Sequence, residues 1–316
     1  MRKLITFALV VVLVAAGMIT VVPARAQQGQ PIRVGSKEFT EQLILGQMII
    51  LALENGGYTV IDKTNLGGSA VNRDALVNGE VDIYPEYTGT AISNYFREVD
   101  FAKIPATASS NAYASYAWVN SLDAAVNDLI WLRPAPANNT YALAVKKDFA
   151  DKNGLKSVAD LAKYVKDGNK IVLATNDEFA QRPDGLASFQ KTYGFTLKDD
   201  QMLVIAGGTP AQTEQALNEG RNDVNVAMVF GTDGALKAYN FVVLTDDKGA
   251  QPVFQPAPVI RGSVLRANPN IAGILAPIFA KLDGPTLQGL NASVDVDGKN
   301  PKAVAKAFLT EMKFIK

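Results

Sequence analysis

Short apolar segments alternate with longer segments of helical spacing along the chain after residue 31. Residues 32–35 predict a strand, and the helix that follows has Thr40 as its expected N-terminal cap and ends at Asn55-Gly56-Gly57. Further strands are predicted at 58–61 and 81–84. Strands that alternate with helices in this way are typical of βαβ units and a mostly parallel sheet.

Two proline-rich segments interrupt this alternation. Residues 134–139 and 249–258 show neither strand nor helical spacing, and each leads into a predicted strand. Two such breaks predict two crossings between two lobes, with the second lobe inserted into the first. We therefore predict a two-lobed α/β fold, each lobe a mostly parallel sheet flanked by helices. The first lobe would comprise 31–137 and 255–316, and the second lobe 138–254.

The N-terminal segment has the pattern of a cleaved export signal. Arg2 and Lys3 precede an apolar run to Val22, and Ala24-Arg25-Ala26 matches a small-residue cleavage site. A transmembrane anchor is the alternative, because the apolar run is nearly long enough to span a bilayer. The polar residues that follow favour cleavage, so we predict a signal peptide at 1–26 and a mature chain that begins near Gln27.

Composition removes several classes of function. The 31 basic and 31 acidic residues balance, so the chain has no electrostatic footprint for nucleic acid or an anionic membrane. The absence of cysteine excludes disulfides, thiol nucleophiles and a lipid-anchor cysteine, and an exported chain without that anchor fits a periplasm. The absence of histidine removes the commonest general base and metal ligand, which weakens an enzymatic interpretation.

Catalytic motifs are weak. Neither of the common phosphate-binding loop motifs occurs. Ser36-Lys37 and the scattered carboxylates would be the basis for a secreted hydrolase, but adjacent residues on an extended backbone point to opposite faces and are poorly placed to act on each other. The carboxylates have no metal-ligand spacing, so we predict neither a metal nor a cofactor.

Residues 81–90, VDIYPEYTGT, carry the most information. Pro85 cannot donate a ladder hydrogen bond, so the strand is expected to end there and to leave Tyr84 and Tyr87 at its mouth. Open α/β sheets bind ligands at such strand ends. Tyrosine offers an electron-rich face, which suits a cation that has no hydrogen to donate.

Several motifs resemble those of one family. They are Gly35-Ser36-Lys37-Glu38-Phe39-Thr40-Glu41-Gln42, Leu66-Gly67-Gly68-Ser69, Asp82-Ile83-Tyr84-Pro85-Glu86-Tyr87-Thr88-Gly89-Thr90, Pro136-Ala137-Asn138-Asn139-Thr140-Tyr141, Glu178-Phe179-Ala180-Gln181-Arg182-Pro183-Asp184-Gly185, Gly231-Thr232-Asp233-Gly234 and Ala257-Pro258-Val259-Ile260-Arg261. In this order they resemble the osmoprotectant (glycine betaine, choline, carnitine) substrate-binding proteins of ABC importers, and most closely the lower-affinity betaine-binding branch. The resemblance covers almost the whole predicted mature chain and implies the two-lobed fold of periplasmic binding proteins of type II.

The resemblance implies a cage of rings around a quaternary ammonium, formed by Tyr87, Tyr141, Phe230 and Phe254. The family commonly has tyrosine at the last two positions. Phenylalanine keeps the ring face, and each ring contributes about 0.5–2 kcal/mol of cation–π attraction, but the hydroxyl is lost.

The family's carboxylate-binding positions fall on Lys37, Thr90 and Arg182. Two cations favour a zwitterionic betaine over choline, provided that both face the cleft, because they can pair with its carboxylate. A salt bridge from Arg182 to Asp184 or Glu178 at the surface is the alternative for that side chain.

The resemblance therefore implies a periplasmic receptor, and not an enzyme, that captures glycine betaine between two lobes. Its partner would be the permease of an ABC importer, and we expect a monomer. A receptor of the same fold for choline, carnitine or another polar solute such as an amino acid is the alternative, and a secreted hydrolase is a remote one.

Overall fold

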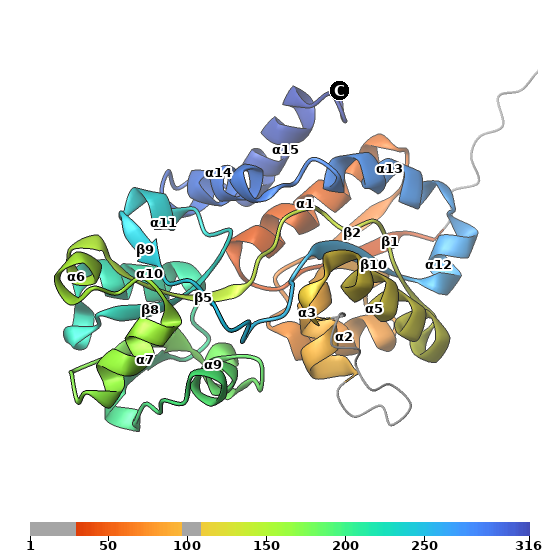
Figure 1. The fold of residues 1–316 in the computed structure, drawn as a ribbon. Coiled ribbons are helices and arrows are strands. Elements are labelled where there is room, and N and C mark those ends of the chain that lie inside the picture. Colours follow the sequence, from red (N-terminus) through yellow and green to blue (C-terminus); the bar gives the residue numbers. More distant parts are fainter. Residues whose placement is uncertain (1–29, 97–108) are drawn as a thin grey trace, which may run out of the picture.

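The computed structural model describes residues 30–96 and 109–316, which form two α/β lobes that lie side by side (Figure 1). The predicted signal peptide at 1–26 lies outside the described residues. Within those described ranges, no helix has both the length and the apolar character needed to cross a bilayer.

The first lobe is built on a five-stranded sheet of order β2-β1-β3-β10-β4. Helix α1 and the C-terminal helices pack on one face of the sheet, and α2, η1 and α5 pack on the other. The strands are β1 (Ile32–Gly35), β2 (Val60–Lys63), β3 (Ile83–Tyr87), β4 (Leu129–Trp131) and β10 (Pro256–Arg261). The helices are α1 (Thr40–Asn55), α2 (Ser69–Val77), α3 (Thr88–Thr90), the π-helical turn η1 (Ala91–Tyr95), α5 (Ala112–Asn127), α12 (Gly262–Ala267), α13 (Asn270–Phe279), α14 (Gly284–Asp295) and α15 (Pro301–Glu311).

The second lobe has a five-stranded sheet of order β7-β6-β8-β5-β9. Its strands are β5 (Tyr141–Lys146), β6 (Leu173–Asn176), β7 (Met202–Ile205), β8 (Val226–Phe230) and β9 (Phe241–Val243). Its helices are α6 (Lys147–Asn153), α7 (Val158–Lys166), α8 (Asp177–Gln181), α9 (Leu186–Tyr193), α10 (Pro210–Glu219) and α11 (Ala235–Ala238), with the short turns η2 (Asp199–Gln201) and η3 (Arg221–Asp223).

Both sheets are mixed, whereas the strand–helix alternation predicted mostly parallel sheets. Among the described residues, each sheet has two parallel and two antiparallel strand pairs. Every antiparallel pair contains β5 or β10. These are the strands that the chain enters directly from a crossing between the lobes, without a crossover helix that would return it in the parallel direction.

Side chains of β5 alternate between the two faces of the second sheet. Tyr141 and Leu143 point into the larger apolar cluster of this lobe, whereas Ala142 and Ala144 point to the cluster beneath α10. Phe39 and Tyr87 of the first lobe also belong to the larger cluster, so the apolar core of the second lobe extends across to the first.

Strand β3 continues through Pro85 to Tyr87, so the prediction that it ends at Pro85 was wrong. Pro85 lies opposite Pro258 in the antiparallel ladder with β10. The Pro258 carbonyl points the other way, because it accepts a hydrogen bond from the Leu132 N–H on the β4 side. The two prolines therefore form a non-hydrogen-bonded pair, in which the β3–β10 ladder does not need the missing N–H of Pro85.

Helix α1 begins at Thr40 and ends at Asn55, close to the predicted bounds, but Thr40 is not its cap. Phe39 occupies the cap position, and the Thr40 hydroxyl instead donates to Asp295 on α14 over 2.5 Å. Strand β2 begins two residues later than predicted and ends at Lys63.

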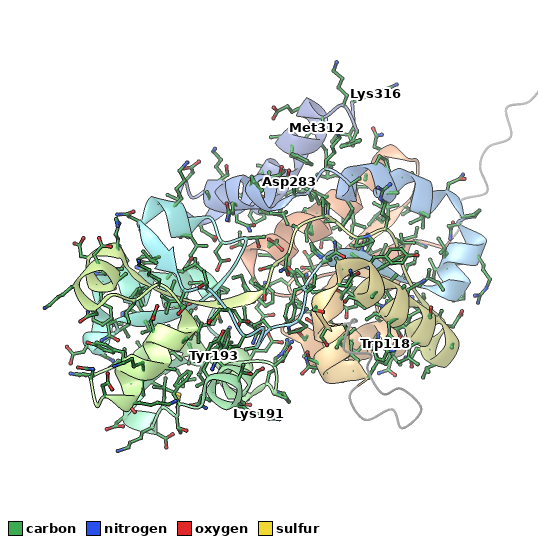
Figure 2. All side chains as sticks on the ribbon, viewed as in Figure 1. Trp118, Lys191, Tyr193, Asp283, Met312 and Lys316 are labelled. Carbon is green, nitrogen blue, oxygen red and sulfur yellow. The ribbon has the colours of Figure 1, made fainter. Side chains whose placement is uncertain are left out.

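The two segments that cross between the lobes are hydrogen-bonded to each other. The Asn139 N–H donates to the Phe254 carbonyl over 2.9 Å, and the Phe254 N–H donates to Asn138 Oδ1 over 2.8 Å. The residues before the second crossing are tied to α9, where the Tyr193 hydroxyl donates to Asp246 over 2.6 Å; Figure 2 labels Tyr193 in the second lobe. Hydrogen bonds therefore hold the two crossings together as one paired unit.

A third connection between the lobes lies on α14, which Figure 1 shows between α1 and α11. The side-chain amides of Gln288 and Asn291 donate to the carbonyls of Gly231 and Thr232, over 3.0 and 2.8 Å. Gly234 packs so closely on the backbone of Ala292 that a side chain at 234 would collide with it. Helix α14 is therefore held against the β8–α11 turn of the second lobe.

Candidate functional site

Ten residues from both lobes and the crossing segments surround a small cavity. They are Lys37, Phe39, Tyr87, Thr90, Asn139, Tyr141, Glu178, Arg182, Phe230 and Phe254. All seven residues that the sequence analysis assigned to the ligand are among them. The cavity volume is about 10 Å³, which is room for about one water molecule. The rings must therefore move apart to admit a trimethylammonium group.

Two of the rings are placed by the register of the second sheet. Tyr141 of β5 lies directly opposite Phe230 of β8, and both side chains point to the same face. Their rings stack with centroids 4.8 Å apart and an interplanar angle of 28°. Cross-strand neighbours of this kind hold each other in place, so these two rings form a rigid wall.

The other aromatic walls come from the crossing segment and the first lobe. Phe254 meets Tyr141 edge-on at 5.8 Å, and Phe39 lies 5.8 Å from Phe230. Gly89 makes room for Phe254, because a Cβ at position 89 would meet that ring at 2.7 Å. The Thr-Gly-Thr turn therefore contributes the space for a ring as well as the Thr90 side chain.

Tyr87 is the last residue of β3, and its hydroxyl is anchored below the cavity. It donates to Glu41 Oε1 over 2.9 Å. Burial, together with the adjacent Glu41 carboxylate, raises the pKa of the Tyr87 hydroxyl well above its usual value. The hydroxyl therefore stays protonated and fixes the orientation of the ring.

Glu41 itself joins both lobes. Besides Tyr87, it accepts hydrogen bonds from Asn139 over 2.8 Å, Thr232 over 2.6 Å and Asn291 over 3.0 Å. Burial raises the pKa of the Glu41 carboxyl, and these donors act in the opposite direction. The four donors come from β3, a crossing segment, the β8–α11 turn and α14, so Glu41 links the cage to the contacts between the lobes.

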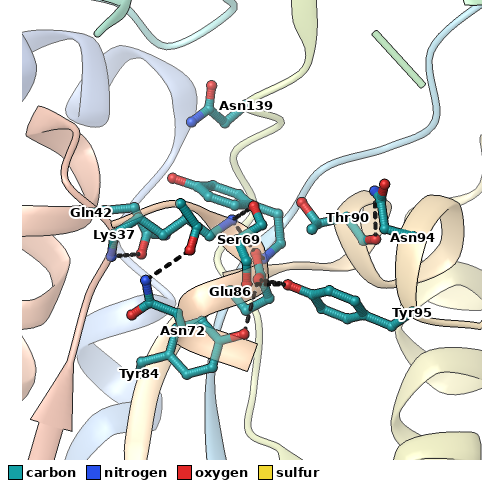
Figure 3. Close-up of polar contacts among 12 residues, drawn as sticks. Lys37, Gln42, Ser69, Asn72, Tyr84, Glu86, Thr90, Asn94, Tyr95 and Asn139 are labelled. Carbon is teal, nitrogen blue, oxygen red and sulfur yellow. Dashed lines mark hydrogen bonds and ion pairs between the residues drawn. The ribbon is translucent and has the colours of Figure 1, made fainter. Parts of the chain in front are cut away.

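Lys37 follows β1 and is buried against the acidic side chain of β3. Its ammonium donates to Glu86 Oε1 over 2.7 Å and to Ser69 Oγ over 2.8 Å, as Figure 3 shows. The second Glu86 oxygen accepts from the hydroxyls of Tyr84 and Tyr95 over 3.0 and 2.6 Å. Tyr84 therefore supports the ion pair from beneath and does not line the cavity.

Arg182 follows α8, with its guanidinium 5.4 Å from the Tyr141 ring. It makes a two-point contact with Asp184 at 2.9 and 2.6 Å, and a further bond to Glu178 at 2.9 Å. Burial alone would lower the pKa of Arg182, yet the negative groups around it raise it well above its usual value. The sequence analysis treated these ion pairs as an alternative to a position at the cleft. Arg182 makes the ion pairs and also lines the cavity.

Both cations thus have carboxylate partners, which changes the electrostatic argument made from the sequence. Lys37 uses two of its three N–H donors on side chains of the described residues. Arg182 uses four of its five on Asp184, Glu178 and Ser69. One N–H therefore remains on each. Two cations face three carboxylates, so the local charge is negative rather than positive.

The lobes touch across the cleft beside the cage. The hydroxyl of Ser69, at the start of α2, accepts a hydrogen bond from Arg182 Nη1 over 3.2 Å. The backbone N–H of Ser69 donates to the Glu178 carboxylate over 3.4 Å. Asn94 lies 3.4–3.5 Å from the Asp184 carboxylate. Arg182, Glu178 and Asp184 of the second lobe are thus already hydrogen-bonded to Ser69 and Asn94 of the first.

The sequence analysis did not assign Phe39, Asn139 or Glu178 to the site, although all three line the cavity. Phe39 had a usable signal, because it directly follows the loop at the end of the first strand. The Ser36-Lys37 pair is not a dyad. The Ser36 hydroxyl donates to the Lys37 carbonyl, and the Lys37 ammonium points to Ser69 and Glu86.

Comparison with known proteins assigns the chain to a family. Residues 30–311 match the family described as the substrate-binding domain of the ABC-type glycine betaine transport system. The chain is 45% identical to the glycine betaine-binding protein YehZ of Escherichia coli, over 93% of this chain and 94% of that protein. It is 36% identical to a glycine-betaine-binding protein of Pseudomonas aeruginosa, over 90% of this chain and 88% of the other.

A solved structure agrees with the predicted architecture. The structure described as a glycine betaine/carnitine/choline ABC transporter is 27% identical and superposes with a TM-score of 0.71, covering 90% of this chain and all of the other. The two-lobed α/β fold predicted from the sequence is confirmed. The chain belongs to the family of substrate-binding proteins of ABC-type glycine betaine transport systems, which are transport components and not enzymes.

Proposed function

We propose that this receptor captures glycine betaine between its lobes and presents it to the membrane permease of an ABC importer. The relatives named for glycine betaine support that ligand. The observation that carries the proposal is the convergence of Tyr87, Tyr141, Phe230 and Phe254 on one cavity. These rings come from both lobes and a crossing segment, so a cation bound among them favours contact between the lobes.

The carboxylate end of the ligand has matching donors. The one N–H left on Lys37 and the one left on Arg182 can each donate a hydrogen bond to an oxygen of the betaine carboxylate without displacing an acidic partner. Thr90 lies on the turn after β3 and lines the same cavity, so its hydroxyl completes this set.

Asn139 supports the methylated end. Its amide nitrogen donates to Glu41, which directs Oδ1 away from that bond, and Oδ1 is buried without a hydrogen-bond partner among the described residues. The methyl hydrogens of a quaternary ammonium carry part of its positive charge and make weak contacts with such an oxygen.

Choline is the second candidate, because one observation favours it. The two cations beside the cavity are outnumbered by the carboxylates of Glu86, Glu178 and Asp184. A plain cation would offset this negative charge, whereas a zwitterion would not. Carnitine and an amino acid remain as further members of the test panel.

The remaining expectations belong to the same proposal. The signal peptide at 1–26, with no lipid anchor, would deliver a monomer to the periplasm. The lobe boundaries at 31–137, 138–254 and 255–316 are supported by the two sheets and by the paired crossings.

A ligand panel tests the proposal. Mature protein purified from a periplasm is heated with glycine betaine, choline, carnitine or an amino acid, and any compound that raises the melting temperature is titrated by calorimetry. Glycine betaine should raise the melting temperature and bind more tightly than the amino acid. Stabilisation by the amino acid alone would contradict the proposal, and tighter binding of choline would favour the second candidate.

A further inference from the structure

Two groups of hydrogen bonds join the lobes near the cage. On the cleft side, α2 is bonded to Glu178 and Arg182, which both line the cage cavity. Beside the crossing segments, Thr232 of the second lobe is bonded to Glu41 of α1 and Asn291 of α14. We call these last three residues the hinge-side contact. None of the three lines the cage cavity, so any effect that they have on a ligand is indirect.

The two oxygens of Glu41 serve different parts of the molecule. Oε1 accepts from the Tyr87 hydroxyl over 2.9 Å and from the Asn139 amide over 2.8 Å, and both of these residues line the cage. Oε2 accepts from the Thr232 hydroxyl over 2.6 Å and from the Asn291 amide over 3.0 Å. One oxygen therefore holds the cage, and the other holds the contact between the lobes.

Asn291 closes the hinge-side contact into a ring. Its amide nitrogen donates to Glu41 Oε2 and, over 2.8 Å, to the Thr232 carbonyl, so both amide hydrogens are used. Thr232 gives its hydroxyl to Glu41 and accepts from Asn291 on its carbonyl. The ring joins α1 and α14 of the first lobe to the β8–α11 turn of the second. A movement of the second lobe away from α14 therefore breaks it.

Burial makes the loss of these bonds unfavourable. The carboxylate of Glu41 and its four partners are each at most 5% exposed, and all four partners are uncharged donors. A buried carboxylate without a cation relies on such donors to offset the loss of its water. The full set of four is present only while the lobes are in contact, so Glu41 favours that arrangement. Loss of the Thr232 donor also loosens the carboxylate that orients the Tyr87 ring.

We propose that Glu41 is a positioning residue for ligand capture, because it makes the placement of Tyr87 and Asn139 in the cage depend on the contact between the lobes. Closure of the lobes and assembly of the cage are then one step. This inference rests on the proposed function and deepens it. It gives control of the affinity to a residue that does not touch the ligand, and it assigns a role to Thr232 and Asn291.

Distances between two spin labels test the inference without any ligand. The chain has no cysteine, so Val77→Cys on α2 and Lys191→Cys on α9 supply the two labelling sites, one exposed position on each lobe. Glu41→Gln replaces an oxygen that accepts two hydrogen bonds with an amide that can only donate. It should shift the distances between the labels to larger values, because the closed arrangement loses its advantage.

Thr232→Val is a second variant for the same measurement. It keeps the branched shape of the side chain but removes the hydroxyl that reaches Glu41, so it should shift the label distances in the same direction. Thr245→Val is the matched control. The Thr245 hydroxyl donates to the Lys156 carbonyl within the second lobe, so its loss should leave the distances unchanged.

Affinity for glycine betaine supplies a test that needs no change at Glu41 itself. Tyr87→Phe removes a donor from Oε1, and Thr232→Val removes one from Oε2. Thr232→Val should weaken binding severalfold in calorimetry, although Thr232 does not line the cavity. If Glu41 couples the two sides, the double variant should lose less affinity than the product of the two single losses, by a factor of at least about two.

The outcomes separate this inference from the proposed function. Unchanged label distances in both Glu41→Gln and Thr232→Val would overturn the inference whatever the ligand is. Losses of affinity that simply multiply in the double variant would also overturn it, because a structural role of each residue alone predicts that result. Larger distances in both variants of a protein that does not bind glycine betaine would support the role of Glu41 in closure and contradict the proposed ligand.

Discussion

Lys37 and Glu86 form an ion pair of 2.7 Å beneath the ligand cavity, and their side chains are 1% and 0% exposed. The pair joins the ends of two neighbouring strands, β1 and β3. Because the partners are buried, neither can be removed without leaving the other charge without compensation. This pair holds the first lobe's share of the ligand site together.

Lys37→Ala should destabilise the protein by about 3–5 kcal/mol, since it leaves the Glu86 carboxylate buried without its cation. Denaturant unfolding monitored by circular dichroism measures the loss. The double variant Lys37→Met with Glu86→Gln removes both charges and should recover most of the stability. A loss below about 1 kcal/mol in Lys37→Ala, the range of an exposed pair, would show that the pair is not buried in solution.

Tyr87→Ala should weaken glycine betaine binding by about tenfold or more, because it removes one ring face from the cage. Tyr87→Phe is the matched control. It keeps the ring but loses the hydrogen bond to Glu41, so binding should fall only a few-fold. Calorimetry measures both affinities, and a folded Tyr87→Ala protein with unchanged affinity would count against the cage.

Asp184→Asn should raise the preference for glycine betaine over choline by about tenfold, the ratio given by ~1.4 kcal/mol. The change removes one of the three carboxylates beside the cavity and loosens the hold on the Arg182 guanidinium. The Arg182 guanidinium then has more N–H donors available for a ligand carboxylate, whereas a plain cation loses the attraction of one negative charge.

Competitive titration of the two ligands measures this ratio. Asp151→Asn, which removes the acidic partner of an exposed pair with Lys147, is the control and should not alter it. Equal changes for betaine and choline in Asp184→Asn would remove the carboxylate argument.

Glu214 makes stability depend on pH. It is 1% exposed, and both of its carboxylate oxygens are buried without hydrogen-bond partners among the described residues. Burial, with Asp233 and Asp295 nearby, raises its pKa from 4.5 to about 10. The folded protein therefore keeps a proton that the unfolded chain releases above pH 4.5, so stability falls as pH rises towards 10, by at most about 1.4 kcal/mol per pH unit.

Glu214→Gln should remove this dependence. Its melting temperature should match that of the parent protein near pH 4 and exceed it by a growing margin as the pH rises to 9. Glu219→Gln, on the exposed side of the same helix, is the control and should show no such growing margin. A constant difference between Glu214→Gln and the parent at all pH values would contradict the protonated carboxyl.

The rings of the cage could be predicted only through the resemblance to a family, because strand position alone does not separate a ligand ring from a core ring. Tyr141 begins β5 and Phe230 ends β8, both continuous apolar strands, and the pairing of the two rings follows once β5 lies beside β8. The continuation of β3 past Pro85 was not predictable, because it depends on Pro258 of a strand far away in the sequence. Only the pairing reveals that the missing N–H faces away from the ladder.

The charge compensation of Lys37 was also beyond the sequence. Glu86 looked like one of several separate carboxylates, and its role depends on β1 lying next to β3, which brings Lys37 within 2.7 Å. Glu41 has four donors that come from widely separated segments. Local patterns cannot show such convergence, because each donor is ordinary in its own segment.

A crystal structure of the receptor with glycine betaine tests the central claim most directly. The ammonium should lie within about 6 Å of the ring centroids of Tyr87, Tyr141, Phe230 and Phe254. The carboxylate should accept hydrogen bonds from Lys37 and Arg182 while both keep their acidic partners. A ligand bound with its carboxylate among the rings, or bound outside the cage, would contradict the account.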